Sequence, residues 1–153
     1  MPIKIELHET IVASPQRVFD LLADLDGAGA WMKGLVQMEK LTQGPFGVGT
    51  RWREVRHWLG QKTAETFEVT AADPGQRVEV VCNGKNGTHK DGHFRFTYAL
   101  ESDGTNTNLT VTEEITELGW FGELMGRVFS GVYKAAMARD VRAMKAYLES
   151  TSG

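Results

Sequence analysis

The segment from Thr50 to Trp58 carries the charged side chains whose spacing best suits chemistry. Glu54 and Arg56 share one parity of this alternating stretch. Trp52 and Trp58 share it as well, which indicates that this parity faces the protein interior. A carboxylate and a guanidinium two residues apart on one strand face can orient a ligand carbonyl or carboxylate, and a desolvated glutamate can serve as a general acid. The alternative is a structural ion pair, or charges that face solvent if the parity is reversed.

A second candidate carboxyl, Glu113, shares its parity with Leu109 and Val111 and should therefore point inward near the end of its strand. A buried carboxyl is costly unless it is paired, so Glu113 is a candidate polar anchor for a ligand, together with the hydroxyl of Tyr98. The alternative is that Glu113 lies at the rim of the sheet and reaches water. The candidates for proton transfer are Glu54, Glu113 and Tyr98, and no catalytic set is assigned.

Two other features could bind a metal or act as a nucleophile. His89, Asp91 and His93 alternate and could present three metal ligands on one side, but no fourth ligand is recognisable nearby. We expect neither a metal nor any other cofactor. Cys82, the single cysteine, cannot form an internal disulfide, has no neighbouring base in the sequence, and is expected to pack as a small hydrophobic residue.

Short antiparallel strands must position these side chains. Glycine, proline, asparagine and aspartate recur at intervals that suit turns between short strands. The candidate strands are 3–11, 35–43, 49–58, 62–72, 77–83, 92–101 and 106–116. Strict alternation in 92–101 and 106–116 predicts an antiparallel sheet with one buried face.

Helices are predicted on both sides of this run of strands. Ser14 as N-cap and Pro15 at the first helical position begin a short helix, and the small residues 26–30 form a second helical turn. Residues 120–150 are predicted to form one long helix that ends the domain. A straight helix touches a strongly twisted sheet along only part of its length, so we expect a cavity between them.

Gly122 and Gly126 lie on one face of this long helix. Glycine inside a helix lowers its stability by roughly 0.5–1 kcal/mol relative to alanine, so two glycines on one helix face need an explanation. Either they leave room for a ligand, or they allow the helix to approach the sheet closely. Beside them runs an apolar stripe that either lines the pocket or packs in the core. Its members are Phe121, Met125, Val128, Phe129 and Val132.

The composition is that of one soluble domain spanning residues 1–153. Of the 153 residues 41% are hydrophobic, and 17 lysines and arginines against 20 aspartates and glutamates give a net charge of −3. No apolar run approaches the roughly 18 residues of a membrane span, and no basic stripe suits nucleic acid. The single cysteine and an amino terminus without a signal-peptide pattern predict a cytoplasmic protein. We expect a monomer or a homodimer.

Several motifs distributed over nearly the whole chain carry a family resemblance. They are Ala13-Ser14-Pro15 with Val18-Phe19 and Leu22-Ala23-Asp24, Trp31 after a short helix, Gly44-Pro45 with Gly47-Val48-Gly49-Thr50-Arg51, Val69 before Asp73-Pro74, Gly104-Thr105 before an amphipathic strand, and the long final helix. The chain resembles the START and birch-pollen-allergen-like (SRPBCC) superfamily, and within it the polyketide cyclase/dehydrase and lipid-transport family. The resemblance implies an α+β helix-grip fold, in which a curved seven-stranded antiparallel sheet wraps around a long C-terminal helix. It also implies two short helices after the first strand and an internal hydrophobic cavity, but no catalytic set.

The expected function is the binding or transport of a hydrophobic or amphipathic small molecule, lipid-like or polyketide-like, in this cavity. The alternative is a polyketide cyclase or dehydratase that folds such a ligand into a reactive geometry. A third possibility, a protein-interaction module, predicts an exposed apolar patch. The expected cavity lining is Trp52, Glu54, Arg56, Phe67, Val80, Phe94, Phe96, Tyr98, Val111, Glu113, Phe121, Gly122, Met125, Gly126, Phe129 and Tyr133.

Overall fold

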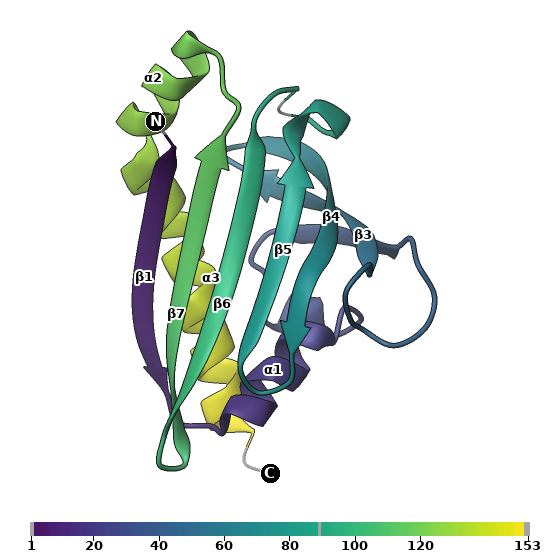
Figure 1. Cartoon of the computed structure of the whole chain (residues 1–153), viewed down its shortest axis with the longest axis vertical. Helices are drawn as coiled ribbons and strands as arrows, with labels where there is room; N and C mark the ends of the chain where they lie inside the picture. Colours follow the sequence, from purple (N-terminus) through teal and green to yellow (C-terminus); the bar gives the residue numbers. More distant parts are fainter. Residues whose placement is uncertain (1, 89, 152–153) are drawn as a thin grey trace.

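A curved antiparallel sheet forms the frame of the protein (Figure 1). The computed structural model describes residues 2–88 and 90–151. Across those residues the sheet has seven strands in the order β1-β7-β6-β5-β4-β3-β2. The strands are β1 (Ile3–Ile11), β2 (Leu35–Lys40), β3 (Arg51–Trp58), β4 (Gln61–Asp73), β5 (Arg77–Asn83), β6 (His93–Asp103) and β7 (Asn106–Thr116). Strands β2 to β7 pair in chain order and β7 then pairs with β1, so the first and last strands lie side by side.

The alternating pattern of the sequence gives the sheet its two faces. In β1, Ile3 and Ile5 are buried while Lys4 and Glu6 are exposed, as expected for a strand with one covered face. The observed strands agree with the predicted ranges to within two residues except for the second, which was predicted to reach residue 43 and ends at Lys40. A loop rich in turn residues follows it, which explains the earlier end.

The first helix begins at a capping residue. Ser14 accepts a hydrogen bond from the backbone N–H of Arg17 and Pro15 is the first residue of α1 (Pro15–Ala23), as predicted. Two short 3-10 helices are η1 (Ala28–Ala30) and η2 (Gly84–Asn86), and the chain ends in α2 (Trp120–Val128) and α3 (Ser130–Ser150). Within the part of the chain that the structure describes, no helix is both long and apolar enough to cross a membrane.

The predicted single helix over residues 120–150 is wrong in one respect, because it is broken at Phe129. This residue has φ −97° and ψ 11°, and α3 starts at the following residue. The hydroxyl of Ser130 donates to the carbonyl of Arg127 (3.0 Å), so a side chain satisfies a carbonyl at the break. The break lets α3 lie along one face of the sheet while α2 lies at the amino-terminal end of β1 (Figure 1).

The hydrophobic core fills the space between the sheet, α1 and the carboxyl-terminal half of α3. Val141, Met144 and Leu148 recur on one face of α3 and are almost completely buried. Facing them are fully buried side chains of the sheet and α1, namely Ile11, Val18, Val69, Val78, Leu109 and Val111. The open volume lies between the sheet, α2 and α3, and Val78 and Val141 of the core also line it.

Candidate functional site

The inner face of the sheet, α2, α3 and the segments around η1 line a half-open cavity of about 390 Å³. Strands β3 to β7 all contribute side chains to it. Many of the lining side chains are aromatic: Trp31, Phe46, Trp52, Trp58, Phe67, Phe94, Phe96, Tyr98 and Tyr133. Small-molecule sites in proteins are concave, measure roughly 300–1,000 Å³ and combine an apolar lining with a few placed polar groups. The cavity therefore has the size and the lining of a small-molecule site.

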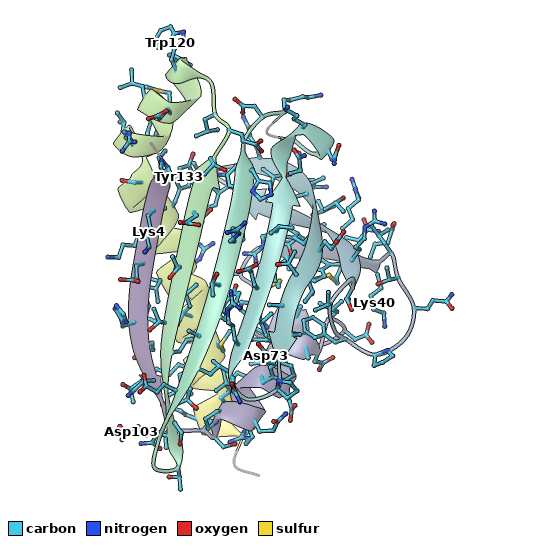
Figure 2. The ribbon with its side chains drawn as sticks, in the orientation of Figure 1. Lys4, Lys40, Asp73, Asp103, Trp120 and Tyr133 are labelled. Carbon is cyan, nitrogen blue, oxygen red and sulfur yellow. The ribbon has the colours of Figure 1, made fainter. Side chains whose placement is uncertain are left out.

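Ring contacts hold the aromatic wall in place. Trp52 stacks on Phe67 of the neighbouring strand, with ring centroids 5.7 Å apart and planes at 17°. Phe67 in turn contacts Phe96 at 6.1 Å. Trp58, near the turn between β3 and β4, stacks on Tyr133 of α3 at 6.0 Å, and Figure 2 labels Tyr133 below α2. This last stack joins the end of β3 to α3 beside the cavity.

A charged network lies at the β3 side of the cavity. Arg56 donates from Nε to Glu54 Oε1 (3.0 Å) and from Nη1 to Asp140 Oδ2 on α3 (2.6 Å). The second oxygen of Glu54 accepts from the indole N–H of Trp52 (3.0 Å), and that of Asp140 accepts from the backbone N–H of Lys33 (2.9 Å). Both carboxylates are therefore fully engaged inside the protein.

The Arg56 network is a structural ion pair of the kind that the sequence left open as the alternative for Glu54. Glu54 is 7% exposed and Asp140 9% exposed. Burial alone would lower the pKa of Arg56, but the charges of Glu54 and Asp140 outweigh it and raise that pKa above its ordinary value. Arg56 stays charged, and both oxygens of Glu54 are engaged by partners within the protein.

Glu113 differs from Glu54 in its surroundings. It lies on β7 opposite Ile5 of β1 and Phe96 of β6 and is 8% exposed. Among residues 2–88 and 90–151 it makes no hydrogen bond and no ion pair. Burial raises its pKa to about 7. The carboxyl thus lines the cavity with both protonation states populated near neutral pH, which suits a general acid or base or a polar anchor.

The third candidate, Tyr98, presents a phenol in the same cavity. Its ring contacts the edge of Trp31 with centroids 6.4 Å apart. Burial and then the charge of Asp140 raise the pKa of the Tyr98 hydroxyl, which keeps it protonated. A protonated phenol in this position can donate a hydrogen bond to a ligand but is a poor base.

Cys82 is buried, as expected, and also lines the cavity. Its thiol donates to Glu65 Oε2 at 3.6 Å. Burial and then the charge of Glu65 raise the pKa of the Cys82 thiol, so it is held as a thiol and not as a thiolate nucleophile.

Most of the predicted lining residues do surround the cavity. They are Trp52, Glu54, Arg56, Phe67, Val80, Phe94, Phe96, Tyr98, Glu113, Gly122, Met125, Gly126 and Tyr133. The structure contradicts three others. Val111 lies opposite Leu7 and Tyr98 in the filled part of the core and is completely buried. Phe121 and Phe129 are 59% and 46% exposed, because α2 turns only its glycine and Met125 side toward the sheet.

Two acidic lining residues, Asp140 and Glu65, were not predicted. Glu65 shares its parity with Phe67 and Val69, so alternation alone could have placed it inside. Asp140 stands in the apolar stripe of the last helix, three residues after Met137, and a lone carboxylate at such a position is a usable signal. Its partner on β3 could not be read from the sequence, because the pairing joins residues far apart in the chain.

The two helix glycines differ in their surroundings. A Cβ atom on Gly126 would lie 2.7 Å from Ile3 Cδ1, so Gly126 allows α2 to approach β1 closely. A Cβ atom on Gly122 would lie 3.4 Å from Asp91 Oδ2, an ordinary contact. Both residues line the cavity, but close helix-to-sheet approach explains Gly126.

The possible metal ligands do not form a cluster in the part that can be described. His89 lies outside the described residues. Asp91 is half-buried in the cavity lining, and His93 is the first residue of β6. Within 2–88 and 90–151, no group of three or more histidine, cysteine, aspartate or glutamate side chains could hold a metal ion.

The outer side of α2 exposes apolar side chains. Trp120, 81% exposed, points away from the protein at the tip of α2 (Figure 2). The other exposed apolar residues of α2 and the start of α3 are Phe121, Leu124, Val128, Phe129 and Val132. The protein thus has both an internal cavity and an exposed apolar surface, although the latter was expected only of a protein-interaction module.

A curved antiparallel sheet that wraps around a long carboxyl-terminal helix, with a cavity between them, defines the helix-grip class of α+β proteins. This is the predicted fold class. The chain belongs to the family described as polyketide cyclase / dehydrase and lipid transport, whose model matches residues 2–149. The resemblance seen in the sequence is therefore confirmed.

The relatives share the fold over nearly their whole length. An uncharacterised protein of Mycobacterium tuberculosis is 26% identical over 138 residues, which cover 90% of this chain and 87% of that protein. A Thermus thermophilus protein of known crystal structure is 20% identical with a TM-score of 0.79, covering 99% of this chain and 100% of that one. The Zhui aromatase/cyclase from a Streptomyces species is 18% identical with a TM-score of 0.80, covering 97% and 94%. At these identities the two crystal structures show a common fold and not a common activity.

Proposed function

We propose that the protein binds a hydrophobic or amphipathic small molecule, lipid-like or polyketide-like, in the cavity between the sheet and α3. The observation that carries this function is the volume of about 390 Å³ walled by aromatic rings. Burial of apolar ligand surface at about 25 cal/mol per Å² supplies the binding free energy, and the few polar side chains set the orientation of the ligand.

Two neighbouring alanines of α3 provide a matched test. Ala136 is half-buried and lines the cavity, whereas Ala135 is exposed on the same helix. The probe is naphthylmethanol, a neutral aromatic alcohol, titrated calorimetrically. Ala136→Phe should fill part of the cavity and weaken binding by about tenfold or more, which corresponds to about 1.4 kcal/mol, while Ala135→Phe should leave it unchanged. Equal affinities for the two variants, or an absence of binding to the wild type, would contradict the proposed function.

A second candidate function, acid-catalysed dehydration or cyclisation, is supported by Glu113. A carboxyl with a pKa of about 7 can protonate a leaving hydroxyl at neutral pH, and the carboxylate that results can accept the Cα proton whose loss forms the double bond, so that water leaves and the carboxyl is restored. The hydroxyl of Tyr98 could hold a ligand carbonyl in the same space.

A simple β-hydroxy ketone, the aldol adduct of benzaldehyde and acetone, tests this candidate because loss of water gives a conjugated, strongly absorbing enone. The wild type should accelerate the reaction, and the rate should fall above pH 7 as Glu113 loses its proton. Glu113→Gln should remove the acceleration. Binding of naphthylmethanol without any turnover of the ketone would favour the binding function alone.

A further inference from the structure

The ionisable side chains that line the cavity are unequal in sign. The carboxyl groups of Glu54, Glu65, Asp91, Glu113 and Asp140 are all buried or half-buried. Among the described lining residues, the guanidinium of Arg56 is the one cation that is not exposed, while Lys33 and Arg139 are exposed. The interior of the cavity therefore has an excess of negative charge, which disfavours an anionic ligand.

Glu113 and Asp91 are the members of this set for which no hydrogen bond or ion pair is found among the described residues, and Glu113, 8% exposed, is the more deeply buried of the two. Glu54 and Asp140 are both bonded to Arg56, so their charges are largely compensated within the protein. The side chains opposite Glu113 in the sheet, Ile5 and Phe96, offer neither a hydrogen-bond donor nor a charge. A ligand is the natural partner for such a carboxyl.

Within residues 2–88 and 90–151, no cation forms an ion pair with Glu113, and burial alone accounts for its raised pKa. The ionisable groups in electrostatic contact with it are Tyr98 on β6, Cys82 on β5 and Tyr133 on α3, all neutral in their ordinary state. Negative charge on Glu113 raises the pKa of each of these three groups, after burial as the first cause. The aromatic rings that line the cavity favour a cation in addition.

We propose that the cavity selects hydrophobic amines, with the apolar body of the ligand against the aromatic wall and its ammonium group on Glu113. The inference rests on the proposed binding function and specifies the ligand class of the same site. It excludes fatty acids and other hydrophobic carboxylates as preferred ligands, because their charge would meet the acidic lining.

Three probes that share one apolar body test the proposal on the whole protein. They are naphthylmethylamine, naphthylmethanol and naphthoate, compared by calorimetric titration. At pH 8 the amine should bind about tenfold more tightly than the alcohol, as expected for a charge-assisted hydrogen bond, and the carboxylate should bind most weakly. An order in which the carboxylate binds best, or in which all three bind equally, would overturn the amine selectivity and leave the binding function intact. If none of the three binds, the binding function fails as well.

Two substitutions in β7 test whether Glu113 causes the preference for the amine. Glu113→Gln should bring the amine down to the affinity of the alcohol without weakening the alcohol. The control is Glu114→Gln, on the opposite face of the same strand, where Glu114 Oε1 lies 3.9 Å from Arg95 Nη1. In this variant the order of affinities for the three probes should be unchanged. An amine preference that survives Glu113→Gln would contradict the role of this carboxyl.

The pH dependence of the wild type gives an independent measurement that needs no variant. The ammonium group pairs with the ionised carboxyl. The affinity for naphthylmethylamine should therefore fall about tenfold between pH 8 and pH 6, as Glu113 with a pKa of about 7 takes up a proton. Affinity for the neutral alcohol should change little. A neutral carbonyl ligand, which accepts from the protonated carboxyl, would show the opposite trend, and an amine affinity independent of pH would contradict the proposal.

Discussion

Replacement of Glu113 by glutamine should stabilise the protein in alkaline solution, which is an unusual outcome for a substitution at a buried polar position. The carboxyl is 8% exposed and lacks a partner among the described residues. Its ionisation inside the protein is therefore uncompensated. Glutamine has a similar shape and no charge, so Glu113→Gln removes the cost of ionisation and leaves the packing almost unchanged.

The size of the effect follows from the pKa. Burial raises the pKa of Glu113 from an ordinary 4.5 to about 7. Below pH 4.5 the carboxyl is protonated in the folded and unfolded protein alike and has no effect. Between pH 4.5 and 7 the unfolded chain ionises first, so the free energy of unfolding falls by about 1.4 kcal/mol per pH unit. Above pH 7 the loss is complete and amounts to about 3 kcal/mol.

Urea denaturation at pH 4.5, 6 and 8 measures this difference directly. Glu113→Gln and the wild type should have similar stability at pH 4.5, and the variant should be more stable by about 3 kcal/mol at pH 8. Glu114→Gln, on the outer face of β7, should not show this rise with pH. A variant that is no more stable than the wild type at pH 8 would refute the conclusion that Glu113 is an unpaired buried carboxyl.

Three further substitutions test other parts of the structure, each by chemical denaturation. Arg56→Met should lower the free energy of unfolding by about 3–5 kcal/mol, because it leaves two buried carboxylates without their cation; a loss below 1 kcal/mol would indicate that the network is hydrated. Gly126→Leu should lower it by about 1–3 kcal/mol, since even a Cβ atom would lie 2.7 Å from Ile3 Cδ1, and a neutral result would show that α2 moves freely. Trp120→Ser should change it by no more than about 0.5 kcal/mol because the indole is 81% exposed, and a large loss would mean that this surface is covered in solution.

The sheet and its inward side chains could be predicted because they depend on a local pattern. Alternation along β3 and β7 placed Glu54 and Glu113 on the covered face, and the same pattern would have placed Glu65 there. Alternation does not show which side chain of another helix or strand pairs with a given residue. The ion pair between Arg56 and Asp140 joins β3 to α3 across 84 residues of sequence, so the part of Asp140 in this network became visible only in the structure.

In the last two helices, the sequence pattern grouped the apolar side chains correctly but did not predict their exposure. The spacing of Phe121, Val128 and Val132 correctly groups them on one side, but periodicity shows only that residues share a face and not that anything covers it. The break at Phe129 redirects α2, so that its apolar side faces outward. Ser130-Gly131 follows the break directly and is a usable signal for it, but the apolar spacing continues across these residues and predicted one continuous helix.

The central claim, that a small hydrophobic molecule lies in the cavity, is tested most directly by the methionine methyl signals in an NMR titration with naphthylmethanol. Met32, Met125 and Met137 line the cavity, whereas Met144, completely buried in the core, and Met38, paired on β2 with Glu54, are not among its lining residues. Ring currents act only over short distances, so the signals of the three lining methyls should shift and those of Met38 and Met144 should stay in place. Saturation without shifts of the lining methyls, or shifts confined to Met38 and Met144, would contradict the account.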